Sequence, residues 1–99
     1  MIYKIILLPT AKADIIQVVK YYKQISIPLA EQFLIRLREA KDYLREIPEG
    51  FQVRYLHVRT LLLKQFPYHI HYLIESKRRR VVILAIIHAY RNPQDYPIQ

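Results

Sequence analysis

The run from Val81 to Ile87 constrains the fold of this chain more than any other stretch. All seven residues are apolar and five of them are β-branched. A continuous run of this kind is typical of a strand buried on both faces, so we expect it in the interior of a sheet. His88, Tyr90 and Arg91 follow directly, and a rigid core holds them at one edge, which makes them candidate target-binding residues. The alternative is that His88 and Arg91 simply end the strand in solvent.

The first half of the chain predicts one strand and two helices. A strand over 2–8 ends at Pro9, which has no N–H for a β-ladder. Thr10 is the expected N-cap of a helix that runs to about Ile25 with one apolar stripe. Pro28 starts a second helix with a similar stripe, and Pro48-Glu49-Gly50 stops it. Two amphipathic helices joined by a short turn suggest an antiparallel hairpin.

The second half predicts short strands separated by tight turns, over 51–55, 59–66, 68–75 and 81–88. The predicted class is therefore α+β. It has an N-terminal strand, a two-helix antiparallel hairpin, and then three to four antiparallel strands that form one sheet. Because each helix has one apolar face, we expect the hairpin to cover one side of that sheet.

The alternation of residues along the strand over 68–75 predicts which side chains share a face. Tyr68, Ile70, Tyr72 and Ile74 are expected beneath the helices, so His69 and His71 fall on the uncovered face. A target-binding surface is expected there, joined by basic side chains of the neighbouring strands, namely Arg54, Arg59 and Lys64.

Length, composition and charge limit the function classes. The 99 residues predict a single domain over 1–99. No apolar stretch approaches the roughly 18 residues of a membrane span, and a chain without Cys fits the cytoplasm. The net charge is +8, and residues 51–99 carry eight Lys and Arg against two Asp and Glu. A polyanion or an acidic protein is the expected partner of that half.

Most enzyme chemistries find no support in the residue pattern. Neither a metal site nor a cofactor is expected, because His69 and His71 have no third ligand at suitable spacing and a single Gly rules out a Gly-rich phosphate loop. RNA cleavage is less demanding. It needs a proton acceptor, a proton donor and cations for the crowded phosphate, and His, Tyr, Lys and Arg fill those roles.

Four motifs, in their order and spacing, resemble the RelE/ParE superfamily of bacterial toxins from type II toxin–antitoxin systems. They are Pro9-Thr10-Ala11-Lys12-Ala13-Asp14, Ala30-Glu31-Gln32-Phe33, Phe66-Pro67-Tyr68 and His88-Ala89-Tyr90-Arg91-Asn92-Pro93. The resemblance implies a cytoplasmic growth inhibitor that a cognate antitoxin, encoded beside it, holds inactive.

Two targets follow from the resemblance. RelE-like members cut messenger RNA on the ribosome, and in that case His69, His71, Arg91 and Tyr96 are the expected catalytic residues. However, Leu61-Leu62-Leu63 stand where such members place lysines, and His69 stands where they favour arginine. ParE-like members bind DNA gyrase, lack that basic set and end in His-x-x-Arg-x-Pro, so the resemblance favours gyrase. A third reading is a basic binding module or a decayed, non-toxic copy.

Overall fold

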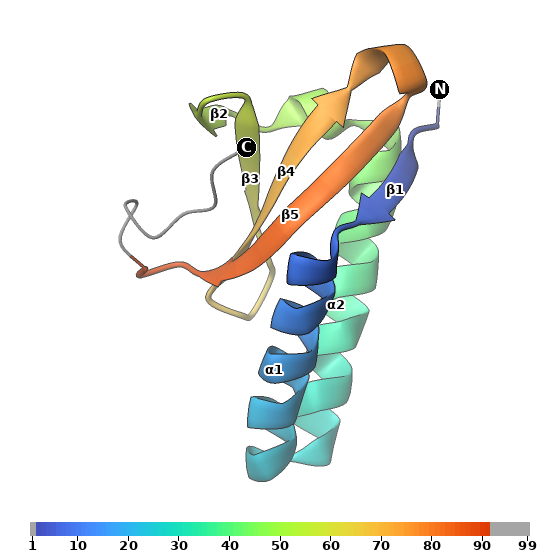
Figure 1. The fold of residues 1–99 in the computed structure, drawn as a ribbon. Coiled ribbons are helices and arrows are strands. Elements are labelled where there is room, and N and C mark those ends of the chain that lie inside the picture. The colour runs from blue at the N-terminus through green and yellow to red at the C-terminus, as the bar shows by residue number, and fades with distance from the viewer. Residues whose placement is uncertain (1, 92–99) are drawn as a thin grey trace.

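The computed structural model describes residues 2–91, which form one five-stranded sheet with two helices packed on one of its faces (Figure 1). The elements in chain order are β1 (Lys4–Leu7), α1 (Pro9–Ile25), α2 (Ile27–Glu46), β2 (Val53–Tyr55), β3 (Val58–Leu62), β4 (Tyr68–Glu75) and β5 (Arg80–His88). Short 3-10 turns occupy Pro48–Gly50 and Ser76–Arg78. Neither helix in the described part of the chain is long and apolar enough to cross a membrane.

The strand order is β1-β5-β4-β3-β2. The last four strands pair antiparallel, whereas β1 pairs parallel with β5, from Lys4 opposite Arg80 to Leu7 opposite Ile83. The α+β prediction is thus confirmed. The run from Val81 to Ile87 is buried throughout and lies between two neighbouring strands, as expected.

The prediction that Thr10 caps the first helix is wrong. The helix begins at Pro9, two residues earlier than a cap at Thr10 requires, and the N-cap residue Leu8 makes no side-chain capping bond. A proline suits this first position because its φ is already helical. The Thr10 hydroxyl instead donates a 2.7 Å hydrogen bond to the carbonyl of Leu84 on β5. The second helix begins near Pro28 as predicted, with the Ser26 hydroxyl accepting from the Leu29 N–H at 3.3 Å.

The sheet separates two clusters of buried side chains. The larger one lies under the helices and includes Phe33, Leu37, Ile70, Tyr72 and Ile83. The smaller one, on the other face, is formed by Val58, Val82, Leu84, Ala85 and Ile87. The predicted alternation along β4 is confirmed, because Ile70 and Tyr72 lie in the helix-side cluster.

An irregularity in β5 places two consecutive residues on the uncovered face. Ala85 lies opposite His71, but Ile83 lies opposite the next residue, Tyr72, so Leu84 is an extra residue in the ladder. Such a β-bulge bends its strand and lets adjacent side chains share one face. Leu84 and Ala85 therefore both belong to the smaller cluster.

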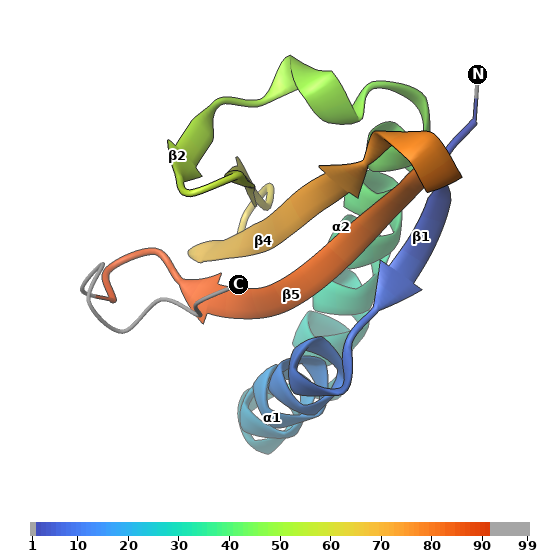
Figure 2. The same cartoon turned by 45° about the horizontal axis from the view of Figure 1, so that its top comes forward.

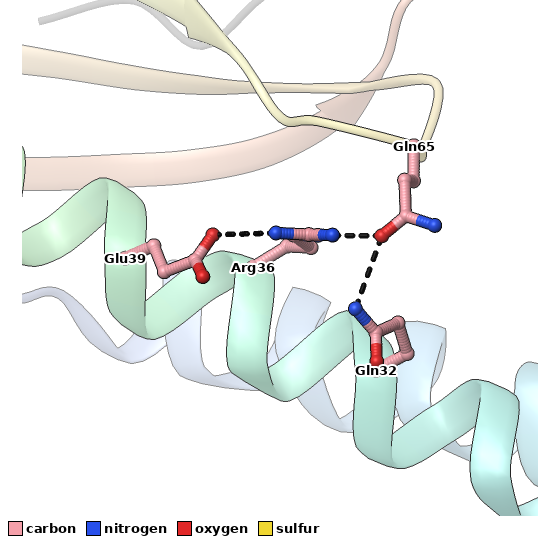
Figure 3. Close-up of polar contacts among 4 residues, drawn as sticks. All are labelled: Gln32, Arg36, Glu39 and Gln65. Carbon is pink, nitrogen blue, oxygen red and sulfur yellow. Dashed lines mark hydrogen bonds and ion pairs between the residues drawn. The ribbon is translucent and has the colours of Figure 1, made fainter.

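The third strand is shorter than predicted, ending at Leu62 instead of residue 66. A turn replaces its last residues, and Gln65 adopts a left-handed conformation with φ 70°. The Gln65 side-chain oxygen accepts hydrogen bonds from Gln32 at 3.0 Å and Arg36 at 2.5 Å on α2, and Arg36 also contacts Glu39 (Figure 3). Side-chain bonds to α2 thus hold the turn and end the strand.

We expect Gln65→Ala to lower the free energy of unfolding by about 1 kcal/mol, because it removes two side-chain hydrogen bonds and keeps the strained backbone. Gln65→Gly removes the same bonds but relieves the left-handed strain, so it is expected to cost less. Urea unfolding of both variants checks this. Equal losses in the two variants would show that backbone strain at this position contributes nothing.

Candidate functional site

The structure forms two candidate sites on opposite faces of the sheet. On the uncovered face, β4 presents His69 and His71 with their ring centroids 6.3 Å apart. Figure 2 shows β4 and β5 side by side, with α2 behind them and α1 below β5 in this view. His71 is fully buried, and its Nδ1 lies 2.9 Å from the hydroxyl of Tyr55 on β2. This pair connects the β2 edge to the middle of the sheet.

Burial makes both imidazoles poor proton carriers. The pKa of His71 is lowered to about 4, mainly by burial and to a smaller extent by the neighbouring His69. Burial, with a smaller contribution from the nearby Arg54 cation, also lowers the pKa of His69. Both side chains are therefore neutral at pH 7, because the charged form of an imidazole is costly in an apolar environment. At that pH they add no positive charge to the uncovered face.

The second site is a groove of about 290 Å³ between α1 and the end of β5. Its polar lining consists of Asp14, Gln17, Tyr21, Tyr68, His88 and Arg91. The Asp14 carboxylate accepts a 3.0 Å hydrogen bond from the N–H of Ile86. Together with the bond from Thr10 to Leu84, this contact holds α1 against the part of β5 that extends beyond the pairing with β1. The groove lies along this contact between α1 and the end of β5.

The residues after β5 form a short turn at the mouth of this groove. The His88 ring packs edge-on against Tyr68, with centroids 5.3 Å apart, and its Nδ1 accepts from the N–H of Tyr90 at 3.3 Å. The carbonyl of His88 accepts from the N–H of Arg91 at 3.0 Å. Tyr90 is 86% exposed. His88, Tyr90 and Arg91 thus lie in one turn at the end of β5.

The remaining predicted site residues lie in three different places. Arg54 lies near enough to His69 to lower its pKa. Arg59 does not join the histidines, because it lies on the helix-covered side of the sheet with Leu61. Its guanidinium donates hydrogen bonds to the carbonyls of Phe51 at 2.5 Å and Glu49 at 3.2 Å. Lys64 lies in a groove between α2 and β3. Tyr96 lies outside the described residues.

Sequence reasoning did not assign Asp14 and Gln17 to a site. The only signal for Asp14 was its place in the first motif, and nothing along the chain connects it with a strand 72 residues away. Among residues 2–91, no group of three or more His, Cys, Asp or Glu side chains is arranged to hold a metal ion.

Comparisons with known proteins agree with this architecture. The family model described as "ParE toxin of type II toxin-antitoxin system, parDE" matches residues 5–93. A solved structure of the chromosomal ParDE system from P. aeruginosa superposes with a TM-score of 0.75 at 20% identity, covering 88% of this chain and 96% of that one.

A second solved structure, the RelBE2 toxin–antitoxin complex from Mycobacterium tuberculosis, superposes with a TM-score of 0.60 at 16% identity. The match covers 89% of this chain and 99% of the other. At these identities the two likenesses concern the fold alone, and no curated protein sequence matches the chain. The family model spans most of the sequence, and on that ground the chain belongs to the ParE toxin family of type II toxin–antitoxin systems.

Proposed function

We propose that this toxin stops growth by binding DNA gyrase in the cytoplasm, without cleaving RNA itself. The observation that carries the proposal is the character of β3 and the residue after it. Leu61 and Leu63 are 6% and 3% exposed and pack in the helix-side core. Ribonuclease members of the superfamily place lysines along this stretch. Here Leu61 and Leu63 stabilise the fold, and the stretch 61–63 offers no cation to a phosphate.

The remaining candidate catalytic groups also argue against phosphate chemistry. Stabilising the charge of a pentacovalent phosphate requires cations aimed at one point, and each such donor is worth about 3 kcal/mol. His69 and His71 are neutral at pH 7, and Arg91 lines the groove beside α1 on the other side of the sheet. His69 and His71 therefore do not converge with Arg91 on one scissile bond. Binding without catalysis is the function that this arrangement supports best.

We infer that a cognate antitoxin neutralises the toxin. Both similar solved structures are of toxin–antitoxin systems. The basic second half, with eight Lys and Arg against two Asp and Glu, suits an acidic partner that orders when it binds. Co-expression with a cognate antitoxin is expected to restore growth, whereas expression of the toxin alone arrests it. A decayed copy would leave growth unaffected in both cases.

Two assays on the same purified protein, first shown to arrest cells, test the target. We expect gyrase to lose its ability to supercoil relaxed plasmid, while cell-free translation of ready-made messenger RNA proceeds fully. DNA topology has no influence on the second assay. Supercoiling that continues undisturbed contradicts the gyrase proposal. Blocked translation with codon-phased cuts would identify a ribosome-dependent endoribonuclease instead.

We expect Arg91→Ala to weaken gyrase inhibition by at least about tenfold, because an interface cation that meets a desolvated partner group contributes about 2 kcal/mol or more. The dose–response curve in the supercoiling assay measures the effect. Arg38→Ala is the matched control, since Arg38 is exposed on α2 and forms no ion pair with another described residue. Both variants should keep the melting temperature of the parent. Unchanged inhibition by Arg91→Ala would exclude the β5 end from the gyrase contact.

A further inference from the structure

The turn between β4 and β5 meets the N-terminal strand at one end of the molecule and gathers basic side chains there. We call this surface the basic end and define it as Lys4, Lys77, Arg78 and Arg79. Parallel pairing of β1 with β5 places Lys4 opposite Arg80, and the Lys4 N–H donates a 2.9 Å hydrogen bond to the carbonyl of Arg79. Figure 1 shows the turn beside the start of β1. Residues more than 70 positions apart in sequence thus form one surface.

Three cations of the basic end keep their charge uncompensated. Lys4, Lys77 and Arg78 are exposed, and no described acidic residue forms an ion pair with them. The neighbouring Arg80 is different, because its guanidinium contacts the Glu75 carboxylate at 2.5 Å. Glu49 lies near Arg79 and offsets part of that charge. The excess positive charge is therefore located on Lys4, Lys77 and Arg78.

The fourth cation, Arg79, is held in place at an energetic cost. Its backbone is left-handed, with φ 50° and ψ 51°, which costs a non-glycine residue about 1 kcal/mol. Its guanidinium lies 4.5 Å from the centroid of the Tyr3 ring, and the Tyr3 hydroxyl donates a 2.6 Å hydrogen bond to Glu49. A strained residue fixed by a cation–π contact is pre-organised and points to a binding role.

We propose that the basic end binds the phosphate backbone of nucleic acid without reading its sequence. Exposed Lys and Arg side chains around a protruding turn match a linear array of phosphates, and each contact releases counterions. Tyr3, the ring that Arg79 contacts, is only 8% exposed and so is not available to stack on a base. The inference goes beyond the proposed function, because the contact requires neither gyrase nor the β5 end.

Fluorescence anisotropy with a short labelled DNA duplex, titrated at several salt concentrations, tests the proposal. The variant Lys77→Ala/Arg78→Ala should bind about tenfold or more weakly, and the slope of log affinity against log salt should fall by about 2. The control is Lys20→Ala/Lys23→Ala, which removes the same two charges from exposed positions near the end of α1, at the opposite end of the molecule (Figure 1). This control should bind like the parent.

Three outcomes overturn the proposal. Equal losses in the two double variants would mean that only net charge matters. A parent protein that does not bind the duplex at moderate salt would exclude nucleic acid. Binding to phosphatidylserine vesicles without binding to the duplex would identify a membrane surface as the partner. None of these outcomes bears on gyrase inhibition, which is measured separately on the same variants.

Discussion

Replacing Phe33 with Ala is expected to lower the free energy of unfolding by about 4 kcal/mol, the largest loss that we predict for a single substitution. Phe33 is fully buried at the centre of an aromatic cluster. Its ring lies 6.0, 5.5 and 5.9 Å from those of Tyr22, Phe66 and Tyr68. These rings come from α1, the turn after β3, and β4, so the substitution opens a cavity where three elements meet α2.

Such a loss is large against the 5–15 kcal/mol that stabilises an ordinary domain. Thermal unfolding followed by far-ultraviolet circular dichroism should show a markedly lower melting temperature for Phe33→Ala. The control is the neighbouring Leu34→Ala, because Leu34 is 41% exposed and is expected to lose about 1 kcal/mol or less. Similar melting temperatures for the two variants would show that the aromatic cluster does not carry the contact between helices and sheet.

Acidification from pH 6.5 to pH 4 is expected to remove about 3 kcal/mol of stability through His71 alone. In the folded protein the pKa of His71 is lowered to about 4, whereas an unfolded His titrates near 6.5. Between these values the unfolded chain binds a proton that the folded chain does not. Stability is therefore complete above pH 6.5 and is lost progressively as the pH falls. The lowered pKa of His69 acts in the same direction.

Chemical denaturation at a series of pH values measures this effect. His71→Gln removes the titrating group, so its stability should change less between pH 6.5 and pH 4 than that of the parent. His88→Gln is the matched control, since His88 is exposed at the end of β5, and it should keep the pH dependence of the parent. If the free energy of unfolding fell equally with pH in the parent and in His71→Gln, the buried, neutral state of His71 would be contradicted.

The helices, the buried strand β5 and the faces of β4 could be predicted because local patterns determine them. Apolar residues at three- and four-residue steps require a helix with one buried face, and a strand alternates its side chains whatever its neighbours are. That alternation alone places His69 and His71 on the other face of β4 from Ile70 and Tyr72. The position of His88, Tyr90 and Arg91 just beyond a strand was predictable for a similar reason, since that buried strand is evident in the sequence.

Contacts between distant segments of the chain decided the strand pairing and the side-chain partners. The sequence by itself determined the element types and, through four motifs, the toxin family. Only the tertiary structure placed β1 parallel to β5, turned Thr10 and Asp14 toward that strand and put Arg59 on the helix-covered face. It also separated the two histidines of β4 from the groove that His88 and Arg91 line. The physical reason is that strand register, bulges and side-chain partners depend on backbone pairing over tens of residues, which leaves no periodic trace in the chain.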